Sequence, residues 1–587
     1  MRTYLSLTVA AFFMLASCQT TAPAPDRPNV ILIMTDDQGY GDFGFTGNPV
    51  IRTPEIDAMA SRSAIMERFY VSPVCAPTRA SLMTGRFNYR TRAIDTWIGR
   101  AMMEPEEVTV AELLSEAGYA TGIFGKWHLG DNYPMRPQDQ GFQEVLVHRG
   151  GGIGQPADPL GGEGKYTDPI LFHNGEETPM KGYCTDIYFD AAMDFIEAGV
   201  KQGKPVFAYI PTNAPHGPYH DVPEDLYQMY KQLDLRPAFA ASVGDAQAAK
   251  LADQTARTFA MITNIDQNVG RLFERLRALG AYDNTLVLFL TDNGPAGPRY
   301  VGALRGYKGG VNEGGIRTPL LAHWPARLRA GRASDRVAGH IDMLPTILEA
   351  CGVPLPAGLQ LDGRSILPLL EGKAGEWPDR TVFVQWHRGD VPERFRNFAG
   401  VSQRWKILHQ NFDEGHPPDP LQFELYDLEA DPGEQNNLAA THPDVLARLR
   451  QEYDAWFDDV GSTRPDNYAP PRIFIGTPHE NPVVLTRQDW RRLGEADNWG
   501  PASRGYWLLR AAAAGEYDLR CVFQPEDAPR SLEVKIAAFE QTVSLLAGVT
   551  EHTFEGVALP AGDARLDATL IRGATLRGVH QIFVTKR

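Results

Sequence analysis

Cysteine is scarce in this chain of 587 residues, and a basic surplus and internal apolar runs of membrane-spanning length are missing. Five cysteines are too few for a dense disulfide framework, so we expect those without a special role to be buried and unpaired. The 57 Lys and Arg residues are outnumbered by 73 Asp and Glu residues, which gives a formal net charge of −16. We therefore expect no nucleic-acid partner, and an anionic substrate would need a local cationic pocket.

The first residues carry a targeting signal. Arg2 precedes an apolar run from Leu5 to Leu15 that is too short to span a bilayer as a stable helix. The junction Leu15-Ala16-Ser17-Cys18 resembles a bacterial lipobox, which implies cleavage before Cys18 and lipidation of its thiol. Because Gln19 is not Asp, the resemblance implies a lipid anchor in the outer membrane of a bacterial cell envelope, facing the periplasm or the cell surface. The alternative is an ordinary cleaved signal with an incidental cysteine.

Continuous apolar runs predict buried parallel strands at 29–34, 206–210 and 286–290. Between the last two runs, apolar residues recur at spacings of three and four from Phe259 to Leu279, and Gly280 follows as a stop signal. This periodicity is typical of an amphipathic helix. Strands that alternate with helices predict an α/β architecture.

The pattern changes after about Trp377. Short strand-like runs at 381–385 and 405–408 and a helix at 443–457 predict a smaller α+β subdomain. A proline-rich stretch then predicts a linker, and evenly spaced short strands predict a β-sandwich that buries its own core and adds no catalytic group. The predicted organisation is a signal peptide at 1–17, a tether at 18–26, a main α/β domain at 27–376, a C-terminal subdomain at 377–460, a linker at 461–482 and an accessory β-sandwich at 483–587.

Polar side chains follow two of the predicted strands. Asp36 and Asp37 come after the first, and Asp292 and Asn293 come after the run at 286–290. Because ligands bind at the carboxyl ends of parallel strands, we expect these side chains to converge there. Their oxygens suit Ca²⁺, or Mg²⁺ as the alternative, better than a soft metal. An ordinary solvated turn is the other interpretation of the adjacent acids.

Two motifs carry a family resemblance. The segment 73–86 reads P-V-C-A-P-T-R-A-S-L-M-T-G-R, and Pro77 can open a helix whose N-terminus favours an anion near Cys75. This segment resembles the C-x-P-x-R signature of type I, formylglycine-dependent sulfatases of the alkaline phosphatase superfamily. The segment 118–130, G-Y-A-T-G-I-F-G-K-W-H-L-G, resembles their second signature. The resemblance covers about 27–457 and implies a large mixed, mostly parallel sheet flanked by helices.

The resemblance also implies the catalytic chemistry. In that family a maturation enzyme oxidises the motif cysteine, here Cys75, to formylglycine (3-oxoalanine), whose hydrated aldehyde is the nucleophile. His216, with Lys308 as a possible partner, would protonate the leaving oxygen, and His128 would act as the base. The implied catalytic residues are Cys75, Arg79, Lys126, His128, His216 and Lys308.

The implied metal ligands are Asp36, Asp37, Asp292, Asn293 and the modified Cys75. Zinc phosphatases of the superfamily carry an Asp-His pair where this chain has Asp292 and Asn293. This difference favours one metal ion over two.

The implied activity is removal of sulfate from a sulfated carbohydrate, as in arylsulfatases and polysaccharide sulfatases, with algal galactans, ulvan or host glycosaminoglycans as examples. The expected substrate-binding residues are Trp97, Arg100, His148, Arg149, His387 and Arg388. One alternative is a formylglycine-dependent phosphodiesterase or phosphonate monoester hydrolase, because a monoanionic diester resembles a sulfate ester. Another is a non-catalytic glycan-binding surface lipoprotein.

Overall fold

The structure is a computed structural model that describes residues 27–240, 243–411, 421–494, 499–500 and 502–587. The predicted signal peptide, the tether and Cys18 lie outside the described residues. None of the described helices combines the length and the apolar character needed to cross a membrane.

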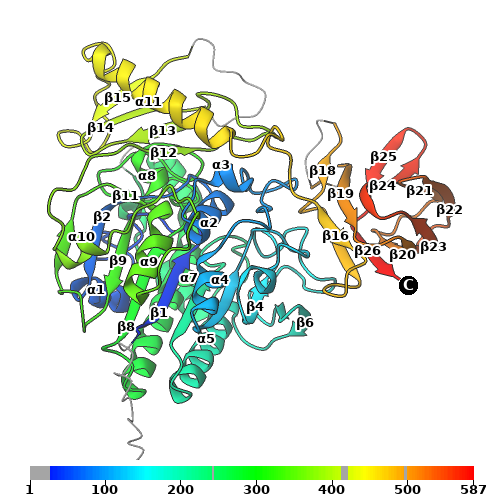
Figure 1. Cartoon of the computed structure of the whole chain (residues 1–587), viewed down its shortest axis with the longest axis horizontal. Coiled ribbons are helices and arrows are strands. Elements are labelled where there is room, and N and C mark those ends of the chain that lie inside the picture. Colours follow the sequence, from blue (N-terminus) through cyan, green and yellow to red (C-terminus); the bar gives the residue numbers. More distant parts are fainter. Residues whose placement is uncertain (1–26, 241–242, 412–420, 495–498, 501) are drawn as a thin grey trace, which may run out of the picture.

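The described part of the main domain is built on an 11-stranded mixed sheet (Figure 1). At its centre, neighbouring strands run parallel in the order β8 (Thr285–Thr291), β1 (Asn29–Thr35), β7 (Val206–Pro211), β3 (Ala120–Lys126) and β4 (Glu144–His148). Strand β9 (Arg317–His323) is antiparallel to both β8 and β2 (Ala64–Tyr70). The edges are formed by β10 (Arg332–Ser334) and β11 (Ala338–Gly339) on one side and by β5 (Ile170–His173) and β6 (Glu176–Pro179) on the other.

Helices cover both faces of this sheet, which confirms the predicted α/β class. Val30 and Leu32 of β1 pack on one face and Ile31 and Ile33 on the other, because successive side chains of a strand point to opposite faces. The first face is covered by α2 (Cys75–Thr84), α4 (Val110–Glu116), α9 (Met343–Cys351) and α10 (Leu367–Glu371). The second is covered by α1 (Pro54–Ser61), α5 (Cys184–Lys201), α6 (Glu224–Lys231) and α7 (Asp245–Ala278), which contains the predicted amphipathic helix.

The smaller subdomain is an antiparallel sheet covered by one long helix. The strands follow in the order β12 (Val382–Gln385), β13 (Phe398–Val401), β14 (Trp405–His409) and β15 (Glu424–Asp427), and the helix is α11 (Pro443–Gly461). A buried ion-pair network joins it to the main domain. The ammonium of Lys406 lies 3.0 Å from a carboxylate oxygen of Glu313 in the short helix α8 (Glu313–Ile316) and 2.8 Å from one of Glu434.

The C-terminal module consists of two facing sheets around one apolar core, as a β-sandwich requires. One sheet contains β16 (Ile473–Ile475), β18 (Arg491–Arg492), β19 (Gly505–Ala511), β21 (Arg530–Ile536), β22 (Phe539–Leu545), β24 (Gly562–Arg572) and β25 (Thr575–Gly578). The other contains β17 (Val483–Thr486), β20 (Gly515–Val522), β23 (Glu551–Leu559) and β26 (Gln581–Lys586).

Strand β16 corrects the predicted linker at 461–482, because it lies inside that range and pairs with β19. The prolines that suggested a linker, Pro470, Pro471 and Pro478, flank the strand and leave its own N–H groups free to pair.

The module is also docked against the main domain. Its core includes Met102 and Met135, which precede it by more than 300 residues in the sequence. The N–H of Phe474 donates to the carbonyl of Tyr133 at 3.0 Å, and the N–H of Tyr133 donates to Glu480 at 2.8 Å. The residues of the predicted linker therefore form part of a packed contact between the module and the main domain.

The cysteines behave as expected. Cys184, Cys351 and Cys521 are buried and unpaired, in α5, at the end of α9 and in β20.

Replacing Lys406 with Met should destabilise the protein strongly. The new side chain keeps the length of lysine but leaves the carboxylates of Glu313 and Glu434 buried without their shared cation, at a cost of about 3–5 kcal/mol. The midpoint of urea unfolding measures the effect. Lys373→Met, which changes an exposed lysine, is the control, and equal midpoints for the two variants would contradict the role of the network.

Candidate active site

The carboxyl ends of two neighbouring strands deliver the acidic residues. Strands β1 and β8 pair in register, with Thr35 opposite Thr291, so the residues that follow each strand lie side by side. The N–H of Asp37 donates to Oδ1 of Asp292 at 3.1 Å, and the amide of Asn293 donates to Oδ1 of Asp37 at 2.9 Å. The structure thus brings together the acidic pairs that the sequence placed after separate strands.

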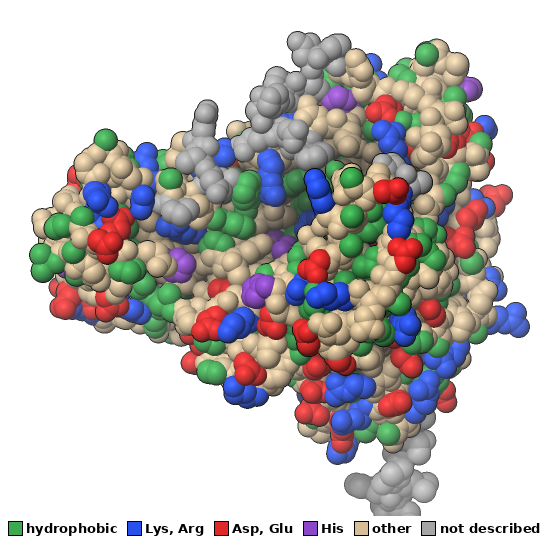
Figure 2. All heavy atoms as spheres, turned by 180° about the vertical axis from the view of Figure 1, so that it is seen from behind, with side chains coloured by type: hydrophobic (Ala, Val, Ile, Leu, Met, Phe, Trp, Pro, Cys, Tyr) green, Lys and Arg blue, Asp and Glu red, His purple; other side chains and the backbone are tan. Residues whose placement is uncertain are grey.

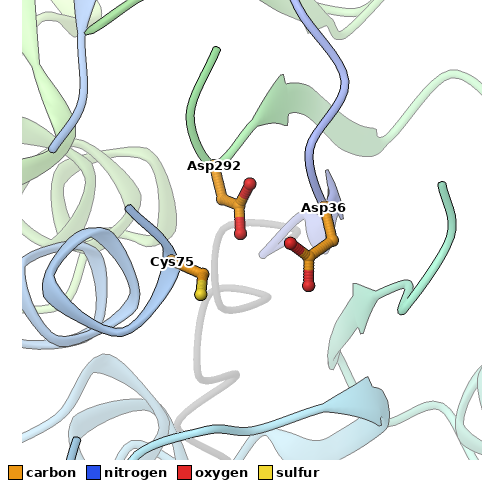
Figure 3. A group of neighbouring side chains, drawn as sticks. All are labelled: Asp36, Cys75 and Asp292. Carbon is orange, nitrogen blue, oxygen red and sulfur yellow. The ribbon is translucent and has the colours of Figure 1, made fainter. Parts of the chain in front are cut away.

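Cys75 is the first residue of α2 and faces these acids. Its thiol and a carboxylate oxygen from each of Asp36 and Asp292 lie within 4.8 Å of one another, and Figure 3 shows the side chains converging. The hydroxyl of Thr78 in the first turn donates to the carbonyl of Asp292 at 2.7 Å, which fixes the helix start to the end of β8. The free N–H groups and positive dipole end of α2 favour an anion in front of Cys75.

Arg79 lies one helical turn after Cys75 and is buried between carboxylates. Its guanidinium lies 2.9 Å from Oδ2 of Asp292 and 3.4 Å from Oδ2 of Asp36, and it also donates to the carbonyl of Lys126 at 2.9 Å. The i, i+4 spacing of the motif therefore places a fixed cation beside the cysteine.

Two lysines supply further positive charge beside the carboxylates. The ammonium of Lys126, at the end of β3, pairs with Oδ2 of Asp36, and that of Lys308 lies 2.5 Å from Oδ1 of Asp37. The structure places Lys308 among the other predicted catalytic residues. Together with the arginine, these lysines provide the local cationic pocket that an acidic chain needs for an anionic substrate.

The pKa values of the acids diverge. Burial by itself raises the pKa of Asp37, but Lys308 and His216 outweigh it and hold that pKa well below its ordinary range. Burial first and the charge of Asp36 second raise the pKa of Asp292 to about 7. A cation between these carboxylates would relieve the repulsion that raises the pKa of Asp292.

The two histidines contact backbone carbonyls through different ring nitrogens. Nε2 of His128 lies 2.9 Å from the carbonyl oxygen of Thr96, whereas Nδ1 of His216 lies 2.8 Å from that of Gly217. Because a carbonyl only accepts hydrogen bonds, those nitrogens carry protons. Burial lowers the pKa of both rings. His128 therefore keeps an unprotonated Nδ1, whereas His216 turns Nε2 toward Asp37, 3.8 Å away.

A glycine-rich loop closes over both imidazoles, which the sequence alone did not indicate. A Cβ on Gly151 would lie 2.7 Å from Cε1 of His128, and one on Gly152 would lie 2.8 Å from Cε1 of His216. Oε1 of Gln155 would lie 2.8 Å from the same Cβ on Gly151, and it is buried with no hydrogen-bond partner among the described residues. This oxygen is available to a ligand hydroxyl.

The acid cluster offers acceptors that a hard cation would satisfy. Oδ1 of Asp36 and Oδ1 of Asn293 are buried and find no donor in the described part of the chain. Buried acceptors without a partner are costly, and oxygen ligands of this kind suit Ca²⁺ or Mg²⁺. Asp36, Cys75 and Asp292 form one geometric group that could hold an ion, and Asp36, Asp37 and His216 form another. The residues present therefore fit the predicted metal.

The predicted substrate-binding residues differ in the partners that their side chains contact. Nε2 of His148 lies 2.7 Å from Asp158, and Arg149 pairs with Glu480 of the C-terminal module and lies over the ring of Phe172. These contacts give both side chains partners within the protein.

His387 is also held internally, since its Nε2 accepts from the N–H of Glu393 at 2.9 Å. Arg388 lies over the half-buried ring of Trp97, 4.0 Å from its centroid, and donates to Asp95 at 2.7 Å. Arg100 is fully buried, and its guanidinium has no hydrogen-bond partner among the described residues.

Comparison with known proteins identifies the family. Residues 28–353 match the family described as Sulfatase, and residues 308–456 match the C-terminal part of N-sulphoglucosamine sulphohydrolase. N-acetylgalactosamine-6-sulfatase of Canis lupus familiaris is 30% identical over 481 residues, which cover 73% of this chain and 85% of that protein. Arylsulfatase A of Homo sapiens is 32% identical over 473 residues, which cover 72% and 86%.

A solved structure supports the same family and fold. The crystal structure of Ps i-CgsB in complex with k-i-k-neocarrahexaose superimposes with a TM-score of 0.62 at 27% identity, covering 73% of this chain and 92% of that chain. The chain therefore belongs to the sulfatase family, is a sulfatase, and has the alkaline phosphatase-like fold that the sequence predicted.

Replacing Asp36 with Asn should weaken binding of a hard divalent cation by at least about tenfold, because the site loses one of its charged oxygen ligands. Calcium titration of chelator-treated protein by calorimetry measures the affinity. Asp283→Asn, which changes an exposed acid outside the cluster, should bind as the wild type does. Equal affinities for both variants, or stoichiometric zinc in the purified protein, would overturn the assignment.

Proposed function

We propose that this sulfatase removes sulfate from a sulfated carbohydrate with a formylglycine derived from Cys75 as nucleophile. The convergence of this buried cysteine at a helix start with three carboxylates, three cations and two oppositely bonded histidines carries the proposal. The formylglycine would supply a hydrated aldehyde, one of whose hydroxyls gives its proton to Asp292 as it attacks sulfur. The unmodified thiol is a poor substitute, because burial raises its pKa and keeps it protonated.

The substrate class rests on the relatives. One is named an N-acetylgalactosamine-6-sulfatase, and the matched structure of Ps i-CgsB holds k-i-k-neocarrahexaose. A sulfated polysaccharide or oligosaccharide, such as an algal galactan or ulvan, is the substrate that we propose. The unpartnered Oε1 of Gln155 beside the catalytic histidines supports a ligand that carries hydroxyl groups.

The cationic residues bind and orient the sulfate group. Lys126 approaches from the end of β3 and Lys308 from the loop before α8, and the N–H groups at the start of α2 face the same space. Arg79 pairs with two carboxylates and lies beside the nucleophile, one helical turn after Cys75. A divalent cation, Ca²⁺ or Mg²⁺, would be held by Asp36, Asp37, Asp292, Asn293 and the modified residue, and it would polarise the sulfate and acidify the nucleophilic hydroxyl.

The two histidines divide the proton transfers. His216 carries a proton on Nδ1, and the charges of Asp37 and Asp36 favour a second proton on Nε2 against the opposing effect of burial. In that protonated form His216 would donate Nε2–H to the leaving oxygen. His128 has a free Nδ1 lone pair and accepts the proton of the remaining hydroxyl, which releases sulfate as the aldehyde is restored. No water needs to attack sulfur in this sequence.

We further propose that the protein is exported and anchored to a bacterial envelope through lipid on Cys18, and that a formylglycine-generating enzyme acts on the Cys75 motif before folding is complete. Burial of the cysteine at 2% exposure supports the order, because a folded chain would not present it.

Protein produced with the maturation enzyme should carry formylglycine at position 75 and hydrolyse 4-nitrophenyl sulfate. Cys75→Ala should lower kcat/KM on the order of a thousandfold, about 4 kcal/mol of transition-state stabilisation, while its thermal midpoint stays near that of the wild type. Peptide mass spectrometry and initial rates provide the measurement.

Fully active protein with an unmodified Cys75 would refute the nucleophile. A bis(4-nitrophenyl) phosphate assay on the same protein provides the control, because preferred turnover of this diester would favour the phosphodiesterase alternative.

His216→Asn should affect substrates according to their leaving groups. A sugar oxygen needs a proton as it leaves, whereas 4-nitrophenolate does not, so the loss should be about 10²–10⁴-fold on a sulfated oligosaccharide and much smaller on 4-nitrophenyl sulfate. Rates on both substrates with each variant measure the difference. Equal losses on both would show that this histidine is not the acid, and His128→Asn should lose activity on both.

A further inference from the structure

The turn between β17 and β18 of the C-terminal module reaches the catalytic loops of the main domain. Gln488, Asp489 and Trp490 in this turn are all nearly or fully buried. Seen from behind, the surface is hollowed where the module meets the main body, and histidine side chains lie at this hollow (Figure 2). The turn therefore belongs to an interface and is not a free loop tip.

This turn holds the segment 96–99 at several points. The N–H of Gly99 donates to the carbonyl of Gln488 at 3.2 Å, and Arg491 donates to the carbonyl of Ile98 at 2.6 Å. Gly99 has a φ of +69°, and a Cβ there would lie 2.8 Å from the carbonyl oxygen of Asp489. The module's backbone thus packs directly against segment 96–99, which precedes the motif at 118–130 in the sequence.

One carbonyl joins the module to the catalytic base. Nε2 of Gln488 donates to the carbonyl oxygen of Thr96 at 3.0 Å, and Nε2 of His128 lies 2.9 Å from the same oxygen. A carbonyl has two lone pairs, so it accepts both N–H groups at once. The position of this oxygen decides which nitrogen of His128 carries the proton.

The same glutamine touches the second loop around the base. A Cβ on Gly150 would lie 3.6 Å from the Gln488 amide, and the next residue, Gly151, lies against the imidazole of His128. Gln488 is only 1% exposed, so water does not compete for its amide N–H. It is wedged between the two segments that enclose the base.

We propose that Gln488 is a positioning residue for His128, so that the C-terminal module is part of the catalytic unit. The proposal rests on the function given to His128 above. Gln488 fixes the Thr96 carbonyl and the carbonyl fixes the proton on Nε2. Nδ1 is then left without a hydrogen-bond partner among the described residues and can accept the proton of the reacting hydroxyl. In this role Gln488 acts through Thr96 and not by touching substrate or nucleophile.

Gln488→Met tests this role, because methionine keeps the shape of glutamine and removes its donor. We expect kcat on 4-nitrophenyl sulfate to fall about tenfold with little change in KM, as when an orienting partner of a catalytic ligand is lost. Gln541→Met, at an exposed position of β22 in the same module, should keep wild-type kinetics.

A double-mutant cycle separates positioning from general damage. If Gln488 acts through His128, then Gln488→Met in a His128→Ala background should cause no further loss of kcat. A further tenfold loss in that background would overturn the proposal, as would unchanged kcat of Gln488→Met in the wild-type background.

Hydrogen exchange gives a readout that does not depend on turnover. Segment 94–100 should exchange faster in Gln488→Met than in the wild type or in Gln541→Met, because the loop loses its side-chain anchor. If the wild-type protein hydrolyses no sulfate ester, the proposed function fails. The exchange comparison still tests the anchoring, because unchanged exchange of segment 94–100 in Gln488→Met would overturn it.

Discussion

Three carboxylates buried at the ends of two adjacent strands have to be compensated, and the active site is built around that constraint. Asp36, Asp37 and Asp292 lie where β1 and β8 end in register, and burial together with the charge of Asp36 raises the pKa of Asp292 to about 7. Arg79 and two lysines supply the compensating charge from α2, from the end of β3 and from the loop before α8. The cations that offset these negative charges are the same ones that would bind an anionic substrate.

Much of this could be predicted because it depends on local patterns. Strand β1 is apolar throughout, since helices cover both of its faces, and such runs are readable from sequence. The rule that ligands gather at the carboxyl ends of parallel strands then placed Asp36 and Asp292 together before any coordinates. The C-x-P-x-R motif encodes one helical turn, so the contact of Arg79 with the acid cluster follows from its spacing to Cys75.

The contacts that escaped prediction join segments distant in the sequence. Prolines around 470–482 suggested a linker, but they flank β16, and Glu480 in that stretch is bonded to the main domain. The approach of Gln488 to Thr96 spans 392 positions and has no periodic or motif signal. The pairing of Arg149 with Glu480 also escaped prediction, because a charged residue in a loop gives no indication of which neighbour will pair with it.

The central claim concerns the acidic cluster at the ends of β1 and β8. This cluster holds one hard cation, and a formylglycine lies beside it in front of the bound sulfate group. A crystal structure of mature enzyme grown with calcium and a sulfated oligosaccharide tests it most directly. The account predicts an oxidised residue at position 75, one cation touching Asp36, Asp37, Asp292 and Asn293, and a sulfate group between Lys126, Lys308 and His216. An unmodified thiol with the sulfate bound elsewhere, in a preparation shown to be active, would contradict it.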